Sequence, residues 1–214
     1  MRTLILFATD EGQTEKIAVR ISERLAEQGF ASDRHNIAVD PETPIALDAY
    51  DAVIVGSPIH YSHYDARLAD YLKQFRDVLH EMPSAFFSVS LGILSDAETE
   101  REEVRKITDA YLSETDWNPL LKIHFAGALS YSRYNWLKRK LMQIIARKAG
   151  SPTDTRFDYE FTNWVQVDQF VDQFVEFVNR CKQSDELYQQ RTIYSTPTRR
   201  YSVAHLRAQA EESA

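Results

Sequence analysis

Six residues near the N-terminus offer the donor groups that bind a phosphate. They follow a run of apolar residues (TLILFA) and precede a helical pattern, and they are Thr9, Asp10, Glu11, Gly12, Gln13 and Thr14. Backbone N–H groups and the dipole at a helix N-terminus attract an anion, threonine hydroxyls add donors, and glycine allows close approach. The loop lacks the lysine of a Walker loop and the three glycines of a dinucleotide fingerprint. It therefore favours a permanently bound monophosphate, with an ordinary threonine-capped turn as the alternative.

Two later loops have a composition that suits a flat ligand. The first contains Ser57, Pro58, Ile59, His60 and Tyr61, and the second contains Ser88, Val89, Ser90, Leu91 and Gly92. Ligands of doubly wound sheets bind at the carboxyl ends of the strands, and all three loops leave such ends. Tyr61 offers an aromatic face to an isoalloxazine ring, and His60, His63 and Tyr64 are further candidate ring neighbours. We therefore predict that the three loops bind flavin mononucleotide (FMN).

Alternating strand and helix patterns separate these loops. Continuous apolar runs, typical of strands buried on both faces, predict strands near 3–8, 51–56 and 85–91, and we expect two more near 32–37 and 122–129. Apolar residues at helical spacing predict helices near 15–28, 65–79, 98–114 and 164–181. The alternation is typical of a doubly wound five-stranded parallel sheet of the α/β class. We expect one domain over 1–181, with an insert at about 130–156, and a polar tail over 182–214.

One segment, residues 130–150, is rich in aromatic and basic residues. Between positions 133 and 148 it holds no acidic residue, and apolar side chains are interleaved with bases in a helical pattern. Such basic amphipathic helices lie on anionic membrane surfaces, and they also attract anionic substrates. The side chains expected to make this contact are Arg133, Trp136, Lys138, Arg139, Lys140, Arg147 and Lys148. The alternative is a helix that packs its apolar stripe on the domain and leaves its bases in water.

The overall composition argues against several classes of protein. A net charge of −7 argues against indiscriminate nucleic-acid binding. The single cysteine, Cys181, excludes an internal disulfide framework and fits a reducing compartment. The N-terminal apolar run is too short for a signal peptide, and no stretch approaches the ~20 apolar residues of a membrane span. We expect a cytoplasmic protein that associates peripherally with the inner face of the cell membrane and has no metal site.

Five sequence motifs carry a resemblance to a known family. They are TLILFATDEGQT, GSPIHYSHY, MPSAFFSVSL, AGALSYSRYNWLKR and TDTRFDYEFTNW. Through them the chain, from Met1 to about Val178, resembles the flavodoxins, and more closely the menaquinone-dependent protoporphyrinogen oxidases. The resemblance implies a flavodoxin-like sheet in which a long-chain-type insert splits the last strand. It also implies that the three loops described above bind FMN.

The resemblance further implies a reaction. Members of this family remove six electrons from protoporphyrinogen IX and pass them through FMN to a membrane quinone, menaquinone or ubiquinone, during haem synthesis. Two other functions stay open, namely a flavodoxin-type electron carrier and a quinone reductase that uses NAD(P)H. The basic segment favours the oxidase over the carrier, because carriers usually dock basic partners with an acidic face.

Overall fold

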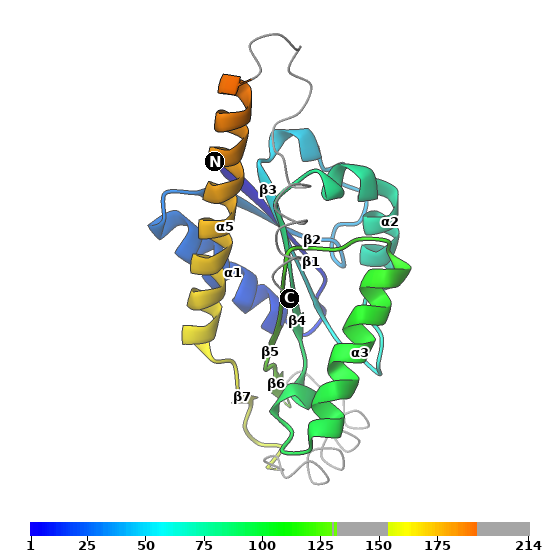
Figure 1. Cartoon of the computed structure of the whole chain (residues 1–214). Helices are drawn as coiled ribbons and strands as arrows, with labels where there is room; N and C mark the ends of the chain where they lie inside the picture. Colours follow the sequence, from blue (N-terminus) through cyan, green and yellow to red (C-terminus); the bar gives the residue numbers. More distant parts are fainter. Residues whose placement is uncertain (130, 132–153, 192–214) are drawn as a thin grey trace.

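A five-stranded parallel sheet forms the centre of the molecule (Figure 1). The structure is a computed structural model that describes residues 1–129, 131 and 154–191. The strands are β1 (Arg2–Phe7), β2 (Ala31–Asn36), β3 (Ala52–Pro58), β4 (Ser84–Val89) and β5 (Leu121–Phe125). They pair in the order β2-β1-β3-β4-β5, and every neighbouring pair runs parallel. The predicted doubly wound sheet is therefore confirmed.

The apolar runs of the sequence lie in the middle of this sheet. Every residue of β1 after Arg2 is buried, and so is nearly all of β3 and β4. Strands of this kind are covered on both faces, which explains their unbroken apolar sequences. The more polar β2 (ASDRHN) is an edge strand with a single neighbour. Because all strands are parallel, their carboxyl ends meet at one edge of the sheet.

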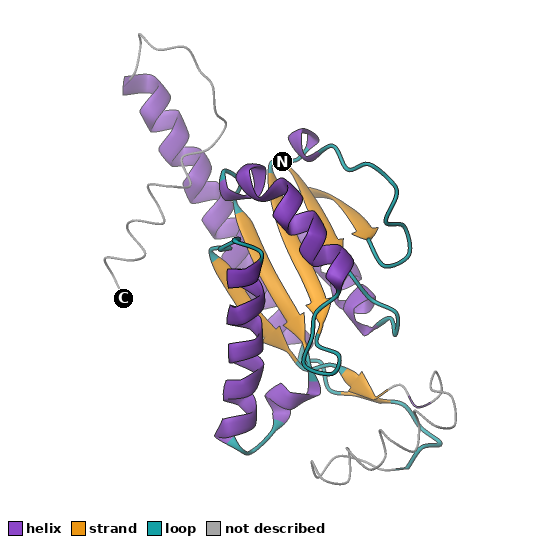
Figure 2. Ribbon diagram, turned by 90° about the vertical axis from the view of Figure 1, so that its right-hand side faces the viewer, coloured by secondary structure: helices purple, strands orange, loops and turns teal. Residues whose placement is uncertain are grey.

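Helices cover the sheet on both faces (Figures 1 and 2). On one face lie α1 (Gln13–Glu27) and α5 (Trp164–Arg191), and on the other lie α2 (Ala66–His80) and α3 (Glu98–Glu114). Each pair encloses its own apolar core: one contains Ile17 and Phe170, and the other contains Leu72 and Tyr111. Two short 3-10 turns, η1 (Leu47–Ala49) and η2 (Leu91–Leu94), lie in the connections.

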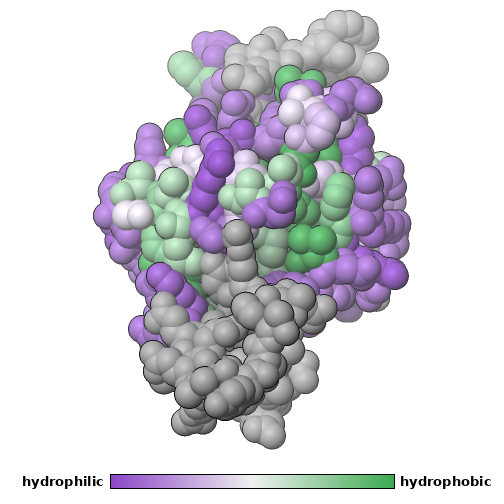
Figure 3. Space-filling view, turned by 90° about the horizontal axis from the view of Figure 1, so that it is seen from above, coloured by the Kyte–Doolittle hydropathy of each residue, from purple (hydrophilic) through white to green (hydrophobic). Residues whose placement is uncertain are grey.

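The surface at the end of the molecule that holds the N-terminus is mixed (Figure 3). Hydrophilic residues gather along its flanks, and apolar residues lie between them.

Within the described ranges, no helix is both long enough and apolar enough to cross a membrane.

The observed elements differ from the expected ones in two places. The last helix continues to Arg191, ten residues beyond the expected end at 181. Those ten residues (KQSDELYQQR) lack an apolar stripe but are rich in good helix formers, so propensity extends the helix. In addition, β5 ends at Phe125, four residues earlier than expected, because β6 (Ala128–Leu129) leaves the main sheet and pairs antiparallel with β7 (Tyr159–Glu160). The insert that we expected to split the last strand lies mostly outside the described residues and stays a prediction.

Candidate functional site

The N-terminal loop leads from β1 into the first turn of α1. Its backbone is fixed to β2, because the N–H of Thr9 donates to Oδ1 of Asn36 at 3.2 Å and Nδ2 of Asn36 donates back to the Thr9 carbonyl at 3.1 Å. Inside the loop, the N–H of Gly12 donates to the Thr9 hydroxyl at 3.0 Å. Gly12 has a φ of 88°, a left-handed backbone that favours glycine. The N–H of Lys16 bonds the Gly12 carbonyl, so the amides of residues 13–15 precede the first helical hydrogen bond and are available to an anion.

The second loop is a tight hairpin at the end of β3. His60 and His63 exchange two backbone hydrogen bonds, at 2.9 and 3.0 Å, and only Tyr61 and Ser62 lie between them. Both central residues have positive φ, 50° and 64°, as the preferred two-residue hairpin turn requires. Glycine or asparagine normally occupies these positions, so tyrosine and serine here store backbone strain, which is typical of functional loops. Tyr61 as a whole residue is 72% exposed.

The third loop leaves β4 and closes immediately into η2. The N–H of Ser90 donates to the Phe125 carbonyl at 3.0 Å, and the Ser90 hydroxyl accepts the N–H of Gly92 at 3.1 Å. A Cβ at Gly92 would lie 3.0 Å from a methyl group of Val104, so the loop packs closely on α3. Ser90 and Gly92 are small, which leaves room for a ligand beside them.

The three loops surround one cavity at the carboxyl edge of the sheet. Its volume is about 290 Å³. It is lined by Thr9, Glu11, Gln13, Thr14, Pro58, Ile59, His60, Tyr61, Val89, Ser90, Leu91, Gly92, Gly127 and Ala128. The structure thus brings most of the predicted ligand-binding residues together, from three loops that are far apart in the sequence.

Six predicted residues do not line this cavity. Asp10, His63 and Tyr64 line a neighbouring cavity of about 200 Å³, and Gly12 lines a third one beside β7. Ser57 and Ser88 are fully buried in adjacent strands, where they are register partners. Their side chains lie within the sheet rather than in the loops that follow it.

Two lining residues were not predicted. Gly127 and Ala128 follow β5, in a small-residue turn (AGA) whose composition was the available signal. This turn is held by Thr162, whose hydroxyl donates to the Ala126 carbonyl at 2.7 Å and accepts the side-chain amide of Gln13 at 2.8 Å. The turn and the N-terminal loop are therefore joined by a buried hydrogen-bond chain.

An ion pair borders the same region. The ammonium of Lys16 lies 2.9 Å from a carboxylate oxygen of Glu160, and the indole N–H of Trp164 donates to the other oxygen at 3.0 Å. Burial raises the pKa of Glu160, but the hydrogen bonds from Lys16 and Trp164 outweigh it and keep this pKa below its ordinary value. Glu160 is thus ionised at neutral pH and holds β7 against α1. In the described part of the chain, no three His, Cys, Asp or Glu side chains gather as a metal site.

The residues expected to contact a membrane or an anionic substrate lie outside the described residues. They are Arg133, Trp136, Lys138, Arg139, Lys140, Arg147 and Lys148. Their role stays a prediction. The chain on both sides of them is described: β6 and β7 form the base of the insert, next to the N-terminal loop.

Comparisons with known proteins agree with this architecture. The family described as "Flavodoxin domain" matches residues 4–156. The chain is 33% identical over 180 residues to protoporphyrinogen IX dehydrogenase [quinone] of Escherichia coli strain K12, which covers 84% of this chain and 98% of that protein. A protein of the same name from Leishmania major is 34% identical over 174 residues, 81% of this chain and 74% of its own.

A solved structure shares the fold. Oxidised flavodoxin 1 from Bacillus cereus superposes with a TM-score of 0.51 at 18% identity, over 82% of this chain and 98% of that one. Fold, cavity position and sequence similarity therefore agree. The chain belongs to the flavodoxin family and, within it, to the quinone-dependent protoporphyrinogen IX dehydrogenases.

Proposed function

We propose that this protein binds FMN and uses it to oxidise protoporphyrinogen IX to protoporphyrin IX, with a membrane quinone, menaquinone or ubiquinone, as the electron acceptor. The observation that carries the proposal is the cavity of about 290 Å³ that all three loops line at the carboxyl edge of the sheet. A loop suited to a phosphate forms one wall, and two loops suited to a flat ring form the others. The name shared by the two relatives supports the choice of substrate and acceptor.

The residues around the cavity fit FMN. The amides of residues 13–15 and the hydroxyl of Thr14 would hold the phosphate, because they combine free donors with the positive end of the α1 dipole. Tyr61 would flank one face of the isoalloxazine ring, and residues 89–92 would border its polar edge with backbone groups. Asp10, Gly12, Ser57 and Ser88, which do not line the cavity, would act by shaping these loops.

The chemistry belongs to the cofactor, which takes electrons from the substrate and gives them to the acceptor. The protein's own residues need only bind, orient and leave access. Tyr61 is largely exposed at the cavity rim, so a flat macrocycle can approach beside it. Leu91 and Gly92 contribute an apolar part of the cavity wall. No acid–base triad is required by this scheme.

The basic segment supports a peripheral position on the inner face of the cell membrane. A lipid-soluble quinone is reached there, and six bases without an acidic neighbour favour an anionic surface. Replacing Lys138, Arg139 and Lys140 with Glu should weaken sedimentation with anionic liposomes while FMN stays bound. Unchanged sedimentation would refute the membrane contact, and neutral liposomes serve as the control.

The oxidase assignment has a direct test. FMN-loaded protein is mixed anaerobically with protoporphyrinogen IX and a menaquinone analogue, and porphyrin fluorescence is followed. Fluorescence should rise well above that of the flavin-free protein. Repeated turnover should require the quinone. No rise would rule out the oxidase. Rapid bleaching of the flavin by NADPH alone would instead favour a nicotinamide-dependent quinone reductase.

A further inference from the structure

Tyr64 stands at the end of the second loop, but its side chain turns inward. Its ring packs against Tyr111, with centroids 4.5 Å apart, and edge-on against Phe86 at 5.5 Å. It was a candidate neighbour of the flavin ring, yet it does not line the main cavity. Burial raises the pKa of Tyr64 to about 12, so its hydroxyl keeps its proton at neutral pH. The loop therefore ends in a half-buried donor rather than in an exposed aromatic.

The Tyr64 hydroxyl has a defined partner on α3. It lies 2.7 Å from the hydroxyl of Thr108, which itself donates to the Val104 carbonyl at 2.9 Å. Thr108 has one hydroxyl proton and uses it on Val104, so Tyr64 must be the donor to Thr108. The Tyr64 oxygen then remains free to accept.

A second hydrogen-bonded pair lies on the sheet. The hydroxyl of Ser88 lies 2.6 Å from Nδ1 of His124, on the neighbouring strand β5. Burial lowers the pKa of His124, which keeps its imidazole neutral near neutral pH. Two polar pairs, His124–Ser88 and Tyr64–Thr108, thus join β5 to β4 and the second loop to α3. The two fully buried hydroxyls, those of Ser88 and Thr108, each have a hydrogen-bond partner, as stable buried polar groups require.

The hairpin needs this support because its tip is strained. Residues 60–63 are exposed, and Tyr61 and Ser62 hold positive φ without the glycine that would favour it. The first end of the loop is fixed by the N–H of Ile59, which donates to the Val89 carbonyl at 2.9 Å. Tyr64 lies at the other end. Because both ends are fixed, the short segment between them has few alternative conformations.

We propose that Tyr64 is a positioning residue, whose hydroxyl holds the second loop so that Tyr61 is already placed to flank a flavin ring. This inference rests on the proposed binding of FMN in the cavity. A loop that is already ordered in the free protein loses little conformational entropy when the ligand binds, so the binding free energy is more favourable. Loss of the Tyr64 anchor should therefore weaken FMN binding, although Tyr64 does not line the FMN cavity.

The chain offers a closely matched control. Tyr111 is the aromatic neighbour of Tyr64, and its buried hydroxyl has no hydrogen-bond partner among the described residues. Tyr64→Phe and Tyr111→Phe thus remove the same atom from touching rings. FMN titration of the apoproteins should give a dissociation constant about fivefold higher for Tyr64→Phe, with faster FMN release, and an unchanged constant for Tyr111→Phe.

Two further variants separate positioning from general damage to the core. Thr108→Val removes the acceptor at nearly constant shape and should weaken FMN binding as Tyr64→Phe does, whereas Thr108→Ser keeps the hydroxyl and should restore the native affinity. Equal FMN affinities for the Tyr64 and Tyr111 variants would overturn the positioning role. Failure of the native protein to bind FMN would overturn the proposed function itself, and the positioning role with it.

Discussion

At the scale of single residues, the cavity depends on backbone conformations that few side chains tolerate. Gly12, Tyr61 and Ser62 all have positive φ, and all three lie in the loops around the cavity. Only Gly12 adopts this conformation without a steric cost. The N-terminal loop is therefore unstrained before an anion binds, whereas the hairpin depends on contacts at its two ends.

Gly12→Ala should weaken FMN binding by about five- to thirtyfold, because left-handed backbone costs an L-residue ~1–2 kcal/mol. The free loop can relax away from this strain, but the bound loop cannot, so the cost falls on binding. FMN titration measures it. The control is Gly29→Ala at the end of α1, where φ is 78° and the position faces open space. That variant should lose stability but keep its FMN affinity, and an equal loss of affinity in both would contradict the argument.

His124 gives the protein a pH dependence whose direction follows from its surroundings. Burial lowers its pKa below the ordinary 6.5, Arg105 and Lys122 lower it further, and Asp109 opposes them. The unfolded chain then binds a proton that the folded protein excludes. The free energy of unfolding should fall as the pH drops below about 6.5, by up to ~1.4 kcal/mol per pH unit, until the lowered pKa is passed.

Urea unfolding between pH 7.5 and 5 measures this contribution. His124→Gln should flatten part of the slope, because glutamine keeps a hydrogen-bonding group but has no titrating proton. Identical slopes in the native protein and His124→Gln would assign the pH dependence to other groups.

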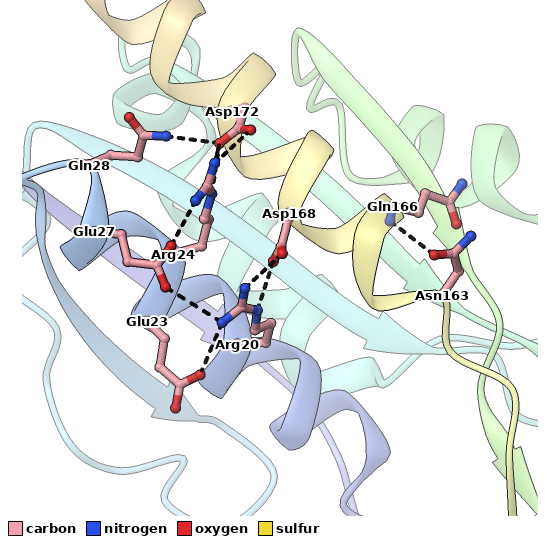
Figure 4. Close-up of polar contacts among 9 residues, drawn as sticks. All are labelled: Arg20, Glu23, Arg24, Glu27, Gln28, Asn163, Gln166, Asp168 and Asp172. Atoms are coloured by element: carbon pink, nitrogen blue, oxygen red, sulfur yellow. Dashed lines mark hydrogen bonds and ion pairs between the residues drawn. The ribbon is translucent and has the colours of Figure 1, made fainter.

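At the scale of elements, a polar seam joins the first and last helices (Figure 4). Arg20 makes a two-point contact with Asp168, at 2.7 Å for both hydrogen bonds, and one turn further on Arg24 contacts Asp172 in the same way. Arg20 and Arg24 are four residues apart on α1, as Asp168 and Asp172 are on α5. The repeat fixes the relative register of two helices that are about 150 positions apart in the chain.

Asp168→Asn should lower the free energy of unfolding by about 0.5–1 kcal/mol, the usual value for a well-aligned pair near the surface. The Arg20 and Asp168 side chains are 30% and 28% exposed, so the loss should shrink at high salt. Chemical denaturation at two ionic strengths measures both effects. Asp77→Asn is the control, since Asp77 is 92% exposed and lies 3.5 Å from its arginine. A salt-independent loss would point to packing rather than charge.

Sequence patterns predict elements better than they predict the direction of single side chains. The run TLILFA identifies β1 because a strand covered on both faces must be apolar throughout. Ser88 and Tyr64 border loops. The local sequence does not determine whether a polar or aromatic side chain at such a position points outward or inward. The inward direction depends on Thr108 and His124, partners from α3 and β5 that no local pattern reveals. The lining role of Gly127 depends likewise on where β6 leaves the sheet.

At the scale of the whole molecule, one hydrogen-bond chain joins the beginning and the end of the domain. The side-chain amide of Gln13 donates to Thr162, and Thr162 donates to the Ala126 carbonyl, so the N-terminal loop, the turn after β5 and the segment before α5 meet at one buried hydroxyl. Gln13 and Thr162 are 149 positions apart. Their contact closes the cavity on the side of β6 and β7, where both ends of the insert return to the domain.

Thr162→Val should therefore affect stability and binding together. The substitution keeps the shape but leaves the buried Gln13 amide and the Ala126 carbonyl without their partner, which costs about 1–3 kcal/mol of unfolding free energy. It should also raise the FMN dissociation constant, because Gln13 and the turn at Gly127 both line the cavity. Thr162→Ser keeps the hydroxyl and should stay close to the native protein in both measurements. If Thr162→Val lost stability but bound FMN with native affinity, this hydrogen-bond chain would stabilise the fold without affecting the cavity. The β6–β7 pair and the N-terminal loop would then act independently in binding.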